Sequence, residues 1–277
     1  MSKKLSIVGI QTIPSTDTEA NLANALKLVD EAFETYKHVD VLVIPEYFYR
    51  VVLKDEVDSV GAYPDEIKKA FSQRAKKHSC YIIAGTVANR KEDGKVYNTA
   101  LVFDRNGEVC GEYSKTHLFD VLDAIGGVKE SDIIARGDKL AIIDTDFGKI
   151  GIIICYDIRF PELARTLALK GVKYLFVPSA FFSPRSDHWQ DILKVTALHN
   201  SMYVMGVNLF GKLNETSVFC GRSIIADPWG VGIATASDKA GIIQSYIDPD
   251  YPDTIRNAVG SFHNRVPELY EIGYDIG

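Results

Sequence analysis

Compact apolar runs alternate with segments of helical periodicity along the whole chain. Residues 5–11 and 39–44 are short, mostly apolar runs, which favour buried strands. Between them, apolar residues recur at helical spacing from 22 to 33, and Thr16 and Glu19 have the spacing of a capping box at the start of that helix. The N-terminal part of the chain therefore predicts a strand, a helix and a second strand.

The same alternation continues through the rest of the chain. Further helices are predicted over residues 64–78, 161–170 and 187–200, and Asp187 is the expected cap of the last one. Further strands are predicted at residues 81–88, 98–103, 108–113, 140–144, 149–155, 173–178 and 202–207, with β-like sequence from 220 onward. Hairpin turns between some of these strands favour mixed sheets, so the predicted fold class is α/β. No linker or repeat interrupts the pattern, which predicts a single domain spanning residues 1–277.

Composition and charge narrow the possible functions. The formal net charge of −6 argues against a nucleic-acid partner, because phosphate binding needs a basic face. No apolar stretch approaches the roughly 20 residues of a membrane span, so no membrane partner is expected. The four cysteines, at positions 80, 110, 155 and 220, form no CxxC pair, which argues against a zinc site and against a disulfide framework. A cytoplasmic protein with reduced thiols is therefore expected.

Three polar residues stand where a sheet protein places catalytic groups, at the ends of predicted buried strands. Glu46 follows VLVIP, Lys115 follows the strand at 108–113, and Cys155 ends the strand at 149–155. A cysteine attacks as its thiolate and needs a base, and an oxyanion needs donors, so a carboxylate and an ammonium could divide these roles. Taken singly, each residue has an ordinary alternative: a buried apolar thiol, a helix cap or surface charge, and a solvated lysine.

The sequence around these three residues resembles the nitrilase, or carbon–nitrogen hydrolase, superfamily. VLVIPEYF, YSKTHLFD and GIIICYDIRFPELAR are similar to its glutamate, lysine and cysteine segments, in the same order and with the three residues 69 and 40 positions apart. The resemblance covers essentially the whole chain and implies a four-layer α-β-β-α sandwich that works without a metal or another cofactor. It also implies a homodimer or higher homo-oligomer, associated through residues 160–169 and the C-terminal tail.

A thioester mechanism for the hydrolysis of small amides is a further implication of the resemblance. Cys155 would attack the amide, Glu46 would carry the proton, and Lys115 with the backbone N–H of Tyr156 would stabilise the oxyanion. The family has a second glutamate in its site, and Glu130 in GGVKESD is the residue that aligns with it. A surface charge in a loop is the alternative interpretation of Glu130.

The nucleophile segment CYDIRFPE is most similar to the omega-amidase-like branch, whose substrates pair an amide with a carboxylate. Arg159 could bind that carboxylate as a bidentate pair, or could form a structural ion pair with Asp157 or Glu162. Within the same resemblance, a carbamoyl-amine hydrolase and a nitrilase remain alternatives. A nitrilase is disfavoured because Tyr156 and Asp157 follow the cysteine where nitrilases usually have Trp-Glu.

Other residues near these segments could shape the substrate pocket. Tyr47 and Phe181 could form its walls, although aromatic residues beside buried strands also belong to ordinary cores. Arg185 is another possible anion anchor, with surface exposure as its alternative. Residues 182–187 and 196–200 depart from the usual omega-amidase pattern, which leaves the identity of the substrate open.

Two rival interpretations come from other classes of protein. A papain-like hydrolase would use His117 or His188 as its base, but neither histidine has the sequence context of that family. A non-catalytic binding module on the same fold would not need Glu46, Lys115 and Cys155, and all three are present. The expected partner is therefore a small-molecule amide.

Overall fold

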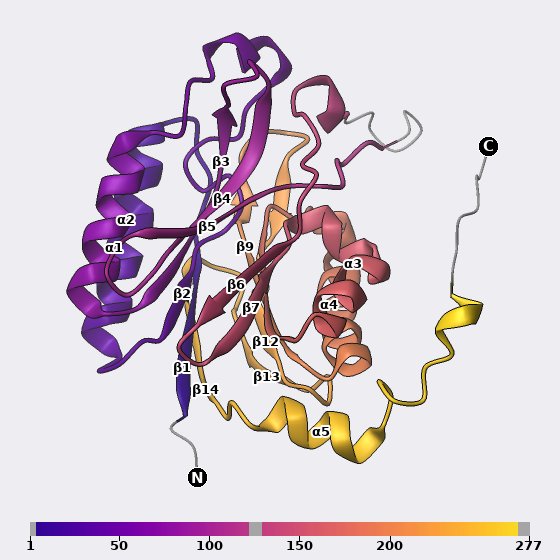
Figure 1. Cartoon of the computed structure of the whole chain (residues 1–277). Helices are drawn as coiled ribbons and strands as arrows, with labels where there is room; N and C mark the ends of the chain where they lie inside the picture. Colours follow the sequence, from indigo (N-terminus) through magenta and orange to yellow (C-terminus); the bar gives the residue numbers. More distant parts are fainter. Residues whose placement is uncertain (1–3, 122–128, 271–277) are drawn as a thin grey trace.

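The computed structural model describes residues 4–121 and 129–270, and within these ranges two six-stranded sheets pack against each other (Figure 1). In spatial order, the first sheet contains β14 (Gly241–Ile247), β1 (Leu5–Gln11), β2 (Val41–Val43), β3 (Tyr81–Arg90), β4 (Val96–Phe103) and β5 (Val109–Ser114). The second contains β13 (Gly232–Thr235), β12 (Ile224–Ala226), β9 (Tyr203–Asn208), β8 (Val172–Ser179), β7 (Gly148–Ile152) and β6 (Ala141–Thr145). A short antiparallel pair is formed by β10 (Phe210–Lys212) and β11 (Val218–Cys220).

Helices cover the outer face of each sheet (Figure 1). The first sheet is covered by α1 (Thr18–Thr35) and α2 (Asp65–His78), and the second by α3 (Pro161–Leu169) and α4 (Ser186–Asn200). The remaining helix of the described ranges, α5 (Tyr251–Val259), follows β14. Short 3₁₀ helices occur at η1 (Lys54–Ser59), η3 (Glu130–Asp132), η4 (Cys155–Arg159), η5 (Ser183–Arg185) and η6 (Pro267–Leu269). Both sheets mix parallel and antiparallel pairs, so the predicted α/β class and the four-layer α-β-β-α sandwich are confirmed. That residues 1–277 form one domain stays a prediction.

Strand β1 shows how the layers are packed. Ile7 lies in the core between the two sheets, whereas Val8 and Ile10 lie in the core beneath α1 and α2. This division follows the period of two with which side chains alternate along a strand. Gly9 faces the second sheet, and a Cβ added there would come within 2.5 Å of the Met205 methyl carbon. The glycine therefore allows β1 and β9 to approach each other closely.

The two predicted helix caps were wrong in detail. The cap of α1 is Asp17 rather than Thr16, and its carboxylate accepts the backbone N–H of Ala20 at 2.9 Å. Aspartate is as good a cap as threonine, so the neighbouring residue could take the position. At α4 the cap is Arg185, and Asp187 lies within the first turn, where its charge complements the helix dipole.

None of the helices in the described ranges combines the length and the apolar character needed to cross a bilayer.

Candidate active site

Glu46 lies just past the end of β2 and is held there by donors from three other segments. Its side chain is almost completely buried. One oxygen, Oε1, accepts hydrogen bonds from Nζ of Lys115 at 3.0 Å and from Nδ2 of Asn98 at 2.7 Å. The other, Oε2, accepts the backbone N–H of Ala180 at 2.7 Å. These bonds orient both oxygens of the carboxylate.

The backbone around Glu46 is closely packed against β3. Tyr47, the next residue, has a φ of +53°, and its N–H donates to Oγ1 of Thr86 at 3.0 Å. A Cβ at Gly85 would lie 2.1 Å from the carbonyl oxygen of Pro45, so only glycine fits at this crossing. The turn that presents Glu46 is therefore tightly defined by its neighbours.

Lys115 follows β5 directly and places its ammonium group between two carboxylates. Its Nζ lies 3.0 Å from Glu46 and 2.9 and 3.2 Å from the two oxygens of Glu130. Its backbone is also held, because its N–H donates to the carbonyl of Asn98 at 2.9 Å and its carbonyl accepts the N–H of Gly137 at 2.8 Å. A buried ammonium with two carboxylate partners is well compensated and keeps its charge.

Glu130 opens η3 and is buried in this cluster rather than exposed on a loop. Besides Lys115, its carboxylate accepts hydrogen bonds from the hydroxyl of Tyr47 at 3.1 Å and from the backbone N–H of Phe119 at 2.8 Å. Nδ2 of Asn98 lies 3.3 Å from the same carboxylate. Of the two interpretations of Glu130 drawn from the sequence, the structure therefore favours a position within the site.

Cys155 stands at a sharp turn at the start of η4. Strand β7 ends at Ile152, three residues earlier than predicted, because the chain turns before the cysteine. Cys155 has a φ of +46°, a left-handed conformation that is uncommon for residues other than glycine. The turn is closed by Asp157, which accepts the N–H of Ile154 at 2.9 Å and donates its own N–H to the carbonyl of Ile154 at 3.0 Å. Strained backbone held in this way is typical of functional positions.

Asp157 also connects the Cys155 turn to the segment that carries Lys115. Its fully buried carboxylate accepts hydrogen bonds from the hydroxyl of Tyr113 at 2.7 Å, from Oγ1 of Thr116 at 3.0 Å and from the backbone N–H of His117 at 2.8 Å. These donors flank the lysine on both sides. One carboxylate therefore sets the position of the thiol relative to the ammonium.

The electrostatics of the cluster favour a neutral thiol beside a base. Burial raises the pKa of Cys155 well above its ordinary value, and the carboxylate of Glu46 raises it further. Burial also raises the pKa of Glu46, against the opposing effect of the Lys115 charge. Burial disfavours the charge of Lys115, but Glu130 and Glu46 together raise its pKa well above the ordinary value. Cys155 and Glu46 line the same cavity and each changes the pKa of the other, so the carboxylate is the group placed to take the proton as the sulfur attacks.

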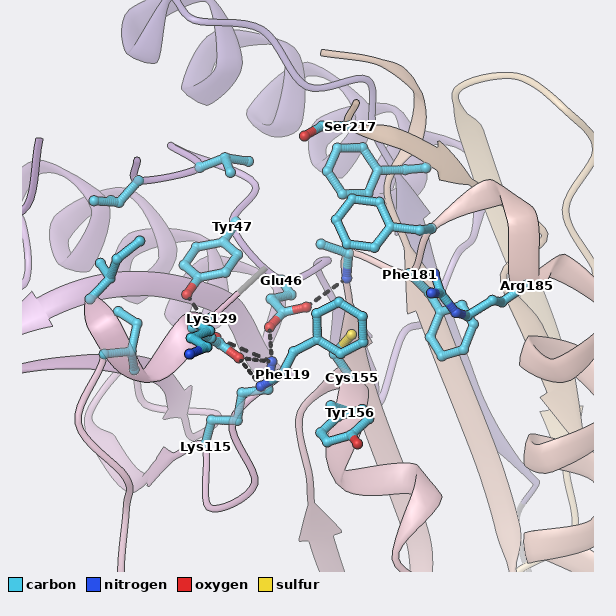
Figure 2. A pocket seen from close by; sticks show the side chains of 18 of the residues that line it. Glu46, Tyr47, Lys115, Phe119, Lys129, Cys155, Tyr156, Phe181, Arg185 and Ser217 are labelled. Atoms are coloured by element: carbon cyan, nitrogen blue, oxygen red, sulfur yellow. Dashed lines mark hydrogen bonds and ion pairs between the residues drawn. The ribbon is translucent and has the colours of Figure 1, made fainter. Parts of the chain in front are cut away.

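These groups line a cavity of about 140 Å³ (Figure 2). Apolar cavities of about 150 Å³ in proteins hold a benzene molecule, so there is room for a small substrate. Six aromatic side chains contribute to its walls: Tyr47, Phe119, Tyr156, Phe181, Phe182 and Phe219. Basic side chains line it as well: Lys115, Lys129, Arg159 and Arg185.

Comparison with known proteins agrees with this geometry. The sequence model of the family described as "Carbon-nitrogen hydrolase" matches residues 4–257. The chain belongs to the carbon–nitrogen hydrolase family. Enzymes of this family act on carbon–nitrogen bonds, so the chain is a hydrolase of that class, as its sequence predicted.

Several relatives of this carbon–nitrogen hydrolase are known. It is 36% identical to the "2-oxoglutaramate amidase" of Bacillus subtilis over 84% of this chain and 88% of that protein. It is 34% identical to "Omega-amidase NIT2-A" of Xenopus laevis over 97% of both chains. The crystal structure of Saccharomyces cerevisiae Nit3, described as a member of branch 10 of the nitrilase superfamily, superposes with a TM-score of 0.85 at 31% identity and covers 94% of this chain and 95% of that one. The predicted resemblance to the omega-amidase-like branch is confirmed by these similarities.

All eight residues predicted for the site of this hydrolase line the one cavity: Glu46, Tyr47, Lys115, Glu130, Cys155, Tyr156, Arg159 and Phe181. Their catalytic and binding roles stay predictions. Arg159 forms neither of the alternative ion pairs: the oxygens of Asp157 are occupied by other donors, and no ion pair joins Arg159 to Glu162 within the described residues. Its Nη2 instead lies 3.4 Å from Nδ1 of His188, and its guanidinium lies over the ring of Phe181 at 5.2 Å.

Sequence reasoning missed two groups that orient the carboxylates. One is Asn98, whose amide donates to both Glu46 and Glu130. The only signal for it was a polar residue at the start of an otherwise apolar strand. The other is the backbone N–H of Ala180, which carries no side-chain signature at all.

The histidines named by the papain-like alternative do not occupy the position of the base. A hydrogen bond of 2.8 Å joins Nδ1 of His117 to Oδ1 of Asp157. The His117 ring stacks on Phe160, with the ring centres 3.7 Å apart. Neither His117 nor His188 is among the described residues that line the cavity, whereas Glu46 is. The geometry therefore favours the carboxylate as the proton carrier.

Proposed function

We propose that the protein hydrolyses the amide group of a small acid amide and releases ammonia. The observation that carries this proposal is the arrangement of Cys155, Glu46, Lys115 and Glu130 around one cavity, with Arg159 in the same walls. The thiol supplies a nucleophile, the buried glutamate supplies a base, and the ammonium supplies positive charge for an oxyanion. The arrangement requires no group beyond the side chains and backbone amides described above.

The reaction proceeds in two halves. In the first, the sulfur of Cys155 attacks the amide carbon while its proton passes to Glu46, and Lys115 with the backbone N–H of Tyr156 stabilises the oxyanion. Glu46 then gives that proton to the departing nitrogen, so ammonia leaves and a thioester remains. In the second half, Glu46 takes a proton from water as its oxygen attacks the thioester, and returns the proton to the sulfur as the acid leaves. Glu130 holds Lys115 in place through both halves.

Two features support an acid amide as the substrate. The relatives named above are described as a 2-oxoglutaramate amidase and an omega-amidase, so acid amides are the substrates to try first. In addition, Arg159 has no carboxylate partner within the described parts of the chain, so its guanidinium is available for the carboxylate of a substrate. With Cys155 in the same cavity, an amide at one end of a short chain and a carboxylate at the other would meet complementary groups.

A substrate panel tests the proposal directly. Ammonia release would be measured with the monoamides of succinate and glutarate, with carbamoyl amines, and with simple nitriles and uncharged amides. We expect kcat/KM for an acid amide to exceed that for the uncharged amide of the same length by about 100-fold, the upper part of what a charged hydrogen-bonded pair contributes. Faster turnover of a carbamoyl amine or a nitrile would assign a different carbon–nitrogen bond to the same site.

We also propose that two copies associate through the outer face of α3 and α4. Leu169, Val195 and Leu198 are large apolar side chains exposed on these helices, and a groove beside them is lined by residues from both helices and from the 261–270 segment. Light scattering on the preparation used for the assays would give twice the 30.7 kDa mass of one chain. A mass of one chain at micromolar concentration would contradict this assembly.

A cytoplasmic location is the last part of the proposal. The structure leaves all four cysteines unpaired, including Cys80 and Cys220 in the buried interior. Reduced thiols are typical of cytosolic proteins. The thiol chemistry proposed for Cys155 also requires that this thiol stay reduced.

A further inference from the structure

The proposed mechanism leaves two charged side chains of the cavity, Arg185 and Lys129, without a role. Arg185 ends η5 and caps α4, and its guanidinium lies over the ring of Phe119 at 5.8 Å. Figure 2 shows it beside Phe181, with Cys155 between it and Lys115 in that view. Arg159, whose guanidinium lies over the ring of Phe181, lines the same cavity. The cavity therefore holds two guanidinium groups besides the Lys115 ammonium.

Neither guanidinium is neutralised by the protein in the described ranges. Other arginines of the chain have carboxylate partners, such as Arg74 with Asp30 at 2.6 Å and Arg222 with Asp238 at 3.1 Å. Within the described residues, 4–121 and 129–270, no ion pair to a carboxylate involves Arg159 or Arg185. Both side chains are partly buried, so the repulsion between their positive charges is stronger than it would be in water.

The two ends of the cavity differ in the charge of the side chains that line them. Glu46 and Glu130 form an acidic end, where Lys115 between them and the exposed Lys129 on the Tyr47 side offset part of their charge. Arg159 and Arg185 form a basic end lined by aromatic rings, and burial lowers the pKa of Arg159 while the charge of Arg185 acts in the same direction. A carboxylate placed at the basic end would remove this repulsion, whereas at the acidic end it would be repelled. Only the basic end therefore suits the anionic part of a substrate.

We propose that Arg185 is a specificity-determining residue, which binds the substrate carboxylate together with Arg159 and selects anionic over uncharged amides. This inference rests on the proposed function, because it names the group that recognises the far end of the acid amide. A carboxylate has about four acceptor sites, and each guanidinium has five N–H donors. The two guanidinium groups can therefore bind one carboxylate from two sides. The surrounding rings exclude water and strengthen the attraction.

The test compares Arg185→Gln with wild type on the glutarate monoamide and on pentanamide, which has a methyl group in place of the carboxylate. We expect KM for the glutarate monoamide to rise about 10- to 100-fold with kcat within about threefold, since one charge-assisted contact is lost. The constants for pentanamide should not change, which also shows that the variant is folded. Equal losses on both amides, or an unchanged KM for the charged one, would overturn the proposal.

Two controls make the result specific. Lys129 also lines the cavity but lies on the Tyr47 side in Figure 2, so Lys129→Gln removes the same charge without touching the basic end and should leave the charged-to-uncharged ratio unchanged. If wild type hydrolyses neither amide, the proposed function fails, and calorimetry of glutarate binding still tests Arg185. Weaker glutarate binding in Arg185→Gln, with no change in Lys129→Gln, supports the proposal, and equal binding in all three proteins overturns it.

Discussion

Replacing Cys155 with alanine should abolish amide hydrolysis, with a fall in kcat of about 10⁵-fold or more. Cys155 is the one thiol among the described residues that line the cavity, so no thioester can form without it. Removal of the nucleophile of a serine hydrolase costs on the order of 10⁶-fold, which sets the scale. Ammonia release measures the loss, and mass spectrometry of wild type trapped during turnover should show the acyl group on the peptide that contains Cys155.

The fold should survive this change. The hydrogen bonds that close the turn come from Asp157 and Ile154 and do not involve the sulfur. Cys220→Ala is the matched control, because Cys220 is a buried free thiol of similar exposure that is bonded to Asn208 outside the cavity. It should keep full activity. Loss of activity in Cys220→Ala, or its retention in Cys155→Ala, would contradict the assignment of the nucleophile.

The regular part of the fold was predictable because each layer has its own local pattern. Strand β1 was expected at residues 5–11 and is observed at Leu5–Gln11, since one face is buried between the sheets and the other beneath the helices. Strand β7 was predicted to extend to Cys155 because Ile153 and Ile154 continue the apolar run. The turn that ends it depends on Asp157 and on donors 40 or more residues earlier in the chain, which no local window contains.

The residues of the site also differ in how far the sequence alone could predict them. Glu46, Lys115 and Cys155 each stand at a strand end within a distinctive local sequence. Each residue alone had an ordinary alternative, and the three segments in order identified them together. Glu130 stands in a loop without periodicity, and only its contacts with Lys115 and Tyr47 distinguish it from a surface charge. The contribution of Asn98 is invisible in sequence for a different reason. Its amide acts between two carboxylates that are distant in the chain, so its role exists only once the sheet has formed.

The contacts of Lys115 join the chemistry of the site to its stability. Its ammonium is the shared partner of Glu46 and Glu130, and Asn98 adds a neutral donor to both carboxylates. A buried charge is tolerated only when its partners remain, so the three ionisable groups depend on one another. Substitution of Lys115 should therefore change the turnover rate, the pKa of Glu46 and the free energy of unfolding together.

Lys115→Met should lower kcat by about 10³-fold, because one oxyanion donor is lost, and should reduce the free energy of unfolding by about 3–5 kcal/mol at pH 8. Burial already raises the pKa of Glu46, and Lys115 is the group that opposes this rise, so without it the pKa of Glu46 should rise further. The base form is then lost at higher pH, and the acid limb of kcat/KM should move upward. A raised carboxyl pKa in the folded state costs stability as pH rises through that value, so the deficit should be smaller at pH 5 than at pH 8.

Urea unfolding at the two pH values and a pH–rate profile measure these effects. Lys54→Met is the control, since Lys54 forms an exposed ion pair with Asp132 at 2.6 Å and its loss should leave stability close to that of wild type at either pH. A Lys115→Met protein that keeps wild-type turnover would exclude the lysine from oxyanion stabilisation. If its stability deficit were the same at pH 5 and pH 8, the cost would come from lost packing rather than from the uncompensated charge of Glu46, because only the charge disappears on protonation.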